Sequence, residues 1–151
     1  MGFTRYWDNV KPSQELADAA KKIIEASDVT IKGGFGEGAP TITAEEIWLN
    51  GDASVGAEHE TLLIDDSENW RGKKYSAFCK TARKPYDEVV AAILIAAAVI
   101  DEEAEIVRDG EFPFDDQAGI ELYQKAVGKI PTGAWNRLAY EEDEVEESLP
   151  F

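Results

Sequence analysis

The segment KTARKPY, residues 80–86, places three cations directly before a long apolar run. Lysine and arginine side chains, a threonine hydroxyl and the free N–H groups at a helix N-terminus all bind phosphate or carboxylate oxygens. The candidate ligand-binding residues are Lys80, Thr81, Arg83 and Lys84, with Tyr86 as a face on which a base could stack. We therefore predict a site for a small anionic ligand, a nucleotide or a phosphorylated metabolite.

The same cations have a structural alternative. Positive charge at a helix N-terminus opposes the helix dipole, at a cost of about 0.3–1 kcal/mol for each charge. Asp87 and Glu88 follow in the first predicted turn and would offset that cost. The cluster is then an ion-pair network with the surrounding carboxylates, and the sequence leaves both interpretations open.

Cys79 and His59 form a second candidate set. If residues 60–64 and 74–80 pair as a hairpin, His59 falls near the Lys80 end of the strand that holds Cys79. A histidine beside a cysteine can activate a thiolate, which would suit a small hydrolase. No third group that would orient the histidine is identified, so catalysis is the weaker hypothesis and no catalytic residue is assigned.

Two other polar segments carry no site. The glycine-rich stretch 33–38 lacks the Gly-Lys-Ser/Thr ending of a P-loop, and we expect a turn there. Asp65, Asp66 and Glu68 do not have the spacing of an EF-hand, and we expect a polar hairpin loop. Neither a metal nor a cofactor is predicted.

Charge is distributed unevenly along the chain. The formal net charge is -16, from 15 Lys and Arg against 31 Asp and Glu, yet residues 71–90 hold six cations and only two acids. So acidic a protein is not expected to bind nucleic acid polymers or an anionic membrane surface. A single cysteine and no long apolar segment predict a cytoplasmic protein without disulfides.

The elements that must position these residues follow from the hydrophobic pattern. Strands are expected at 3–7, 29–32, 42–49, 60–64, 74–80 and 104–108. Helices are expected at about 13–26, with Ser13 as the N-cap, and from 115 or 116 to about 127. The run VVAAILIAAAVI, residues 89–100, is hydrophobic on every side and too short for a bilayer, which predicts a buried central helix over about 85–100.

This order of elements predicts one α+β domain over residues 1–140. Short connections between strands favour a mainly antiparallel sheet, with the central helix and further helices packed on it. The segment EEDEVEE opens a separate, acidic stretch over 141–151, for which we expect a mobile tail.

The segment FCKTARKPYDEVVAAIL (78–94), with HETLLI (59–64) and ITAEEIWLNGD (42–52), resembles a family of small phage and actinobacterial proteins with an FCKTxRKPYD-type motif. The resemblance spans most of residues 3–127 and is most specific over 78–87. It implies no catalytic residues. It implies a phage-encoded accessory or counter-defence protein, which could sequester a nucleotide signal of the host.

Three functions therefore remain as hypotheses. The first is non-catalytic binding of a small phosphorylated ligand by the 80–86 segment. The alternative is an acidic interaction module that inhibits a basic host protein in the manner of a DNA mimic. The third and weakest is a hydrolase that uses Cys79 and His59, so binding is favoured over catalysis.

Overall fold

The computed structural model describes residues 2–66 and 77–140 of the 151-residue chain. Within these residues the chain forms four α-helices and two antiparallel sheets of three strands each. The predicted α+β class is confirmed. The acidic segment 141–151 lies outside the described residues, so the predicted boundary near 140 stays a prediction.

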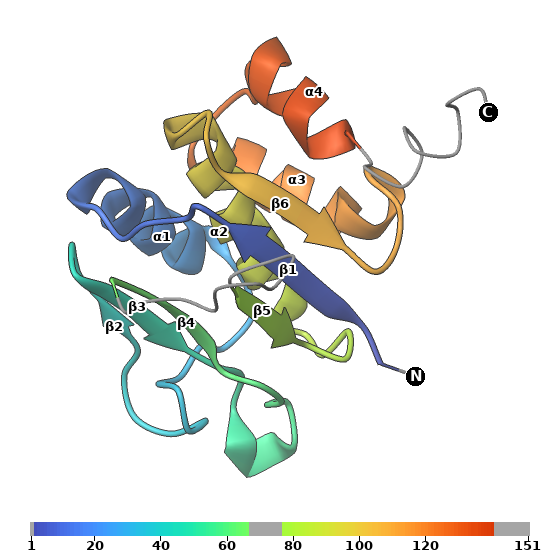
Figure 1. The fold of residues 1–151 in the computed structure, drawn as a ribbon. Coiled ribbons are helices and arrows are strands. Elements are labelled where there is room, and N and C mark those ends of the chain that lie inside the picture. Colours follow the sequence, from blue (N-terminus) through green and yellow to red (C-terminus); the bar gives the residue numbers. More distant parts are fainter. Residues whose placement is uncertain (1, 67–76, 141–151) are drawn as a thin grey trace.

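The first sheet has the strand order β5-β1-β6. Its middle strand β1 (Thr4–Asp8) pairs antiparallel with β5 (Ala77–Lys80) on one side and with β6 (Glu105–Arg108) on the other. Figure 1 shows the three strands side by side, with β1 between two strands from much later in the chain. The expected strands at 3–7 and 104–108 are confirmed to within one residue.

The second sheet has the order β2-β3-β4, formed by β2 (Thr41–Ile42), β3 (Glu46–Leu49) and β4 (Leu62–Asp65). The expected continuous strand at 42–49 is wrong, because a turn interrupts it. In that turn the Thr43 hydroxyl accepts hydrogen bonds from the N–H groups of Glu45 and Glu46. The expected strand at 29–32 is reduced to an isolated bridge between Lys32 and Asn50.

The predicted hairpin between 60–64 and 74–80 is also wrong, and residues 74–76 lie outside the described part. β4 pairs with β3, whereas β5 pairs with β1 in the other sheet. Only the start of the 60–64 segment meets β5, where the Glu60 N–H donates to the Lys80 carbonyl. Strands that follow each other in sequence usually pair, but all four residues of β5 pair with β1 instead.

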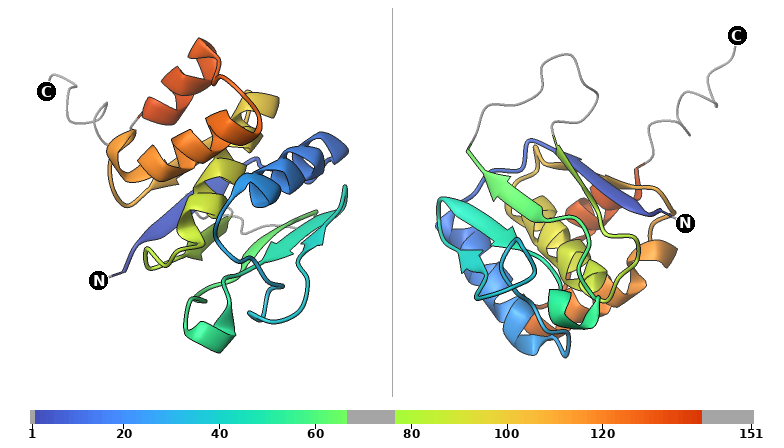
Figure 2. Two further views of the ribbon diagram at one scale, coloured as in Figure 1. Left: turned by 180° about the vertical axis from the view of Figure 1, so that it is seen from behind. Right: turned by 90° about the horizontal axis from the view of Figure 1, so that it is seen from below.

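The core is built around α2 (Asp87–Ile100), and every residue from Val89 to Ala98 is at most 4% exposed. α1 (Gln14–Ala26), α3 (Gln117–Ala126) and α4 (Thr132–Ala139) pack against it, as the two views of Figure 2 show. Gly119 permits the close approach of α3, since a Cβ at this position would stand 2.5 Å from the Cβ of Ala91. The predicted buried central helix is confirmed, but it begins at Asp87, after Pro85.

The remaining helical segments differ from expectation mainly at their ends. Ser13 caps α1 as predicted, its hydroxyl accepting from the Leu16 N–H. α3 is preceded by a 3-10 turn at Phe114–Asp116, and a second such turn spans Ala53–Val55. α4 was not predicted, although Ala134 and Leu138 are spaced by one helical turn and both are buried. No helix in the described residues is long and apolar enough to cross a membrane.

Candidate functional site

The predicted cation cluster lies on a tight turn between β5 and α2. The Lys84 N–H donates to the Thr81 carbonyl at 3.0 Å and closes the turn. Its two central residues, Ala82 and Arg83, have φ values of 53° and 58°, in the left-handed region. For a residue other than glycine, this conformation costs about 1–2 kcal/mol. The turn is held because the N–H groups of Thr81 and Ala82 both donate to the Phe3 carbonyl.

The three cations of this turn point to three different partners. Arg83 is half exposed, with its guanidinium 3.0 Å from Asp115 and over the ring of Phe3. The Lys84 ammonium donates to the Gly56 carbonyl at 3.0 Å. The Lys80 ammonium lies 5.9 Å from the centre of the exposed Phe78 ring. The geometry therefore does not direct the three charges at one common point.

The two uncharged members of the predicted site are buried and already bonded. The Thr81 hydroxyl donates to the Asp87 carboxylate, and the Tyr86 hydroxyl donates to the Glu60 carbonyl. Both residues are 0% exposed, so Tyr86 offers no face to a base. An anion does lie at the start of α2, but it is the carboxylate of Asp87 in the first turn.

The cation that Asp87 binds is Arg5 in β1, which the sequence analysis did not identify. Arg5 donates to both oxygens of Asp87, at 2.8 and 2.9 Å, and to Asp116 at 2.6 Å. The other Asp116 oxygen lies 3.1 Å from Arg108, the residue opposite Arg5 in the β1–β6 ladder. We call these four residues, Arg5, Asp87, Arg108 and Asp116, the buried charge network.

The network balances two positive charges with two negative ones. Burial by itself would lower the pKa of Arg5, but hydrogen bonds and charge from Asp87 and Asp116 outweigh it and raise that pKa above its ordinary value. Arg5 is therefore charged in the folded protein. A signal for it exists in the sequence, because the alternation Phe3-Arg5-Trp7 places the arginine on the same strand face as two aromatic residues.

Cys79 and His59 do not form a catalytic pair. Cys79 is fully buried, its thiol donates to the Glu60 carbonyl at 3.3 Å, and burial raises its pKa to about 12. His59 does lie at the Lys80 end of β5, as expected, but its Nδ1 bonds to the Lys80 carbonyl at 2.6 Å and must be the donor. A neutral, buried thiol gives no support to the hydrolase hypothesis.

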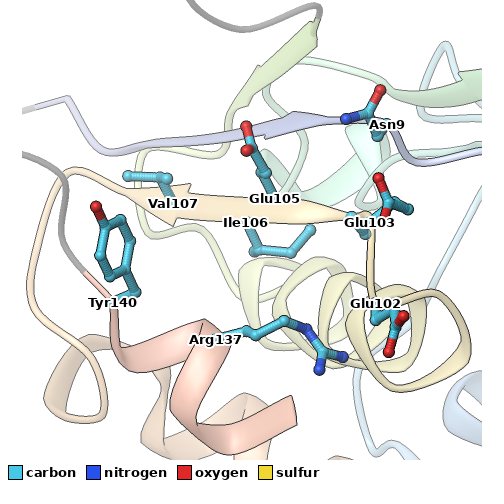
Figure 3. Close-up of a pocket in the computed structure, with 9 residues that line it drawn as sticks. Asn9, Glu102, Glu103, Glu105, Ile106, Val107, Arg137 and Tyr140 are labelled. Atoms are coloured by element: carbon cyan, nitrogen blue, oxygen red, sulfur yellow. The ribbon is translucent and has the colours of Figure 1, made fainter. Parts of the chain in front are cut away.

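A cavity of about 290 Å³ lies elsewhere, between β6 and α4 (Figure 3). Its wall is formed by the continuous segment from Glu102 to Val107, by Asn9 after β1, and by Arg137 and Tyr140. Glu102, Glu103 and Glu105 are exposed at its rim. Sequence reasoning missed this cavity, although the acidic run at 101–105 was visible.

The C-terminal end of α2 adds negative potential beside the cavity. A helix C-terminus carries a partial negative charge, and the last turn of α2 has no basic residue of its own. Arg137 from α4 bonds the Ala98 carbonyl instead, through its Nη2 atom. Arg137 keeps its charge in this bond and lines the cavity together with Glu102, Glu103 and Glu105, so the lining holds three negative charges against one positive charge.

No group of three or more metal-ligating side chains is found within residues 2–66 and 77–140. Glu68, which was weighed with Asp65 and Asp66, lies outside that part of the chain. Comparisons with protein-family models, with curated proteins and with solved structures found no match.

Proposed function

We propose that this chain is a non-catalytic interaction module whose acidic surface binds a basic partner protein. The observation that carries the proposal is the presence of three exposed glutamates, Glu102, Glu103 and Glu105, in the lining of the cavity between β6 and α4. The cavity supplies a concave surface, and the carboxylates supply the charge that selects a basic partner. A formal net charge of -16 would steer such a partner toward the surface over a longer range.

The arrangement resembles the way in which a DNA mimic presents carboxylates in place of phosphates. Two arginines of the same sheet do not oppose this surface, because Arg5 and Arg108 are buried with Asp116. Among the described residues, Arg137 is the one cation in the cavity lining, against three glutamates. Carboxylates such as Glu102, Glu103 and Glu105 remain at the surface, where a lysine or arginine can reach them.

A peptide titration tests this proposal. The probes are two short fluorescent peptides, one of alternating lysine and valine and one of alternating glutamate and valine. The basic peptide is expected to bind, with an affinity that falls as salt is added, because screening weakens charge attraction. Equal binding of both peptides, or no binding of the basic peptide at low salt, would refute the proposal.

A second candidate function is the binding of a small phosphorylated ligand at the turn of residues 81–84. The strained conformation of Ala82 and Arg83 supports it, because backbone strain of this kind concentrates at functional sites. A thermal-shift screen of sulfate, sugar phosphates and mono-, di- and cyclic nucleotides tests it. A true site would show a stabilising ligand whose affinity falls about tenfold or more in Arg83→Ala.

A further inference from the structure

We infer that the outer edge of β6 is the place where the basic partner binds, as an extended segment that adds a fourth strand to the β5-β1-β6 sheet. This inference rests on the proposed function and names the mode of binding. It is carried by three observations: an unpaired strand edge, a cavity along that edge, and carboxylates beside it.

The unpaired edge follows from the register of the ladder. The Asp109 N–H donates to the Thr4 carbonyl and continues the pairing of β1 with β6. Hydrogen-bonded pairs alternate along an antiparallel ladder, so Val107 and Glu105 turn their main-chain groups toward β1. Ile106, between them, turns its N–H and C=O to the opposite edge.

Those groups of Ile106 have no partner in the part of the chain that the structure describes. β6 is the last strand of its sheet there, and no main-chain hydrogen bond joins Ile106 to a residue outside the sheet. Ile106 is only 6% exposed. The unpaired N–H and C=O of an edge strand are a template for another strand, so a strand laid along this edge would satisfy both groups of Ile106 at once.

The cavity provides the room that such a strand needs. Figure 3 shows β1 and Asn9 on one side of β6 and the side chains of Arg137 and Tyr140 on the other, so part of the cavity lies along the outer edge. The far end of the edge is closed, because Arg108 bonds the Leu138 carbonyl of α4. A short segment centred on Ile106 therefore fits, and a long one does not.

Charge and strand geometry define the segment. Side chains directly opposite each other in neighbouring strands share one face of the sheet. The residue opposite Ile106 therefore turns toward α2 and should be apolar, while its two neighbours lie on the solvent face with Glu105 and should be basic. The occupant is a basic-apolar-basic stretch of a partner protein in extended conformation.

N-methylated versions of the lysine–valine peptide test the pairing. The segment is inferred to run antiparallel to β6 with a valine opposite Ile106, so the valine N–H groups point at β6 and the lysine N–H groups point away. Methylating every valine nitrogen should weaken binding by about tenfold or more, and methylating every lysine nitrogen should change it by less than about threefold. The two methylated peptides have the same charge. Equal binding of both would overturn the inference and leave the proposed function standing.

Matched variants of the protein test the location. The triple change Glu102→Gln, Glu103→Gln and Glu105→Gln should weaken binding of the parent peptide by about tenfold. The control alters three exposed acids of α1 by the same total charge, Glu15→Gln, Asp18→Asn and Glu25→Gln, and should change binding by less than about threefold. Equal losses in the two variants would overturn the β6 location. Failure of the unmodified basic peptide to bind would instead refute the proposed function itself.

Discussion

The two groups of cations in this protein contrast sharply in how they are placed. Arg5 and Arg108 stand far apart in the sequence, yet they meet inside the protein and share Asp116. Lys80, Arg83 and Lys84 stand close together in the sequence, yet their side chains diverge to three separate partners. Cations that are close in sequence therefore need not share a partner in the folded protein. The pairing of β1 with β6 brings Arg5 and Arg108 together. The tight turn between β5 and α2 directs its three cations to different partners.

The contrast is tested most strongly by Asp116→Ala. Removal of this carboxylate leaves Arg5 and Arg108 buried without their shared partner, which should lower the free energy of unfolding by about 3–5 kcal/mol. Urea denaturation near neutral pH measures the loss. The surface control is Arg83→Ala, which breaks an exposed pair with Asp115 and should cost about 1 kcal/mol or less. Similar losses of unfolding free energy in the two variants would show that the buried and the exposed cations contribute equally to stability.

The buried thiol of Cys79, next to Lys80, should react very slowly with an alkylating reagent. Burial raises the pKa of Cys79 from 9.0 to about 12, so below pH 9 the thiolate is on the order of a thousandfold scarcer than in an exposed cysteine. Iodoacetamide labelling should be correspondingly slow and should keep rising with pH above 9. A plateau near pH 9, or a marked slowing in His59→Ala, would point to an activated thiol.

The same pKa shift has a consequence for stability. Between pH 9 and about 12 the unfolded thiol loses its proton while the folded thiol retains it. The unfolded state then binds fewer protons, so stability should fall as pH rises through this window. Cys79→Ser, which does not ionise there, should lose this part of the pH dependence in a thermal melt.

A smaller effect is expected for Thr81→Val, which changes the buried face of the turn. The substitution retains the shape of the side chain and removes the hydroxyl that donates to Asp87. A hydrogen bond to a charged group contributes about 1.5–3 kcal/mol, and this is the expected loss in urea denaturation. Lys84→Ala, on the exposed side of the same turn, is the control and should cost less than about 1 kcal/mol. A neutral Thr81→Val would mean that Arg5 alone satisfies Asp87.

The smallest effect concerns the backbone of the turn. Ala82→Gly removes the strain of the left-handed conformation, about 1–2 kcal/mol, but gives the unfolded chain more freedom, about 0.5–1 kcal/mol. We expect a net stabilisation of between zero and about 1.5 kcal/mol. Ala139→Gly, at the exposed end of α4, lacks the strain and should be destabilising by about 0.5–1 kcal/mol. Loss of stability in Ala82→Gly would show that the turn is unstrained.

The sequence predicted well those elements that depend on local pattern. The run at 89–100 is long and apolar on every side, which is typical of a buried helix, and Ser13 before an amphipathic stretch marks a helix start. Strand partners were predicted poorly, because the β5 pattern is equally consistent with β4 or β1 as a neighbour. The turn at 43–46 was not predicted, because it depends on hydrogen bonds to the Thr43 side chain.

The candidate sites depended on long-range contacts and were harder to predict. Thr81 and Tyr86 looked accessible because charged residues surround them in sequence, yet both side chains turn inward. The cavity at β6 could not be predicted from an acidic run alone, because it also requires α4 and the free edge of the sheet. The burial of Arg5 could have been predicted, because the residue lies between two aromatic residues on one strand face.

The position of β1 in the middle of its sheet has a consequence for folding during synthesis. β1 leaves the ribosome before its partners, because its neighbours in the sheet are residues 77–80 and 105–108 and Arg5 pairs with Asp116. At about 5–20 residues per second, the ribosome needs several seconds or more to supply these partners. The first sheet cannot be complete before residue 108 is available, and Arg5 lacks its second carboxylate partner until residue 116 is available. Folding of this protein should therefore be slow and should occur late in translation, as expected for native contacts between distant parts of a chain.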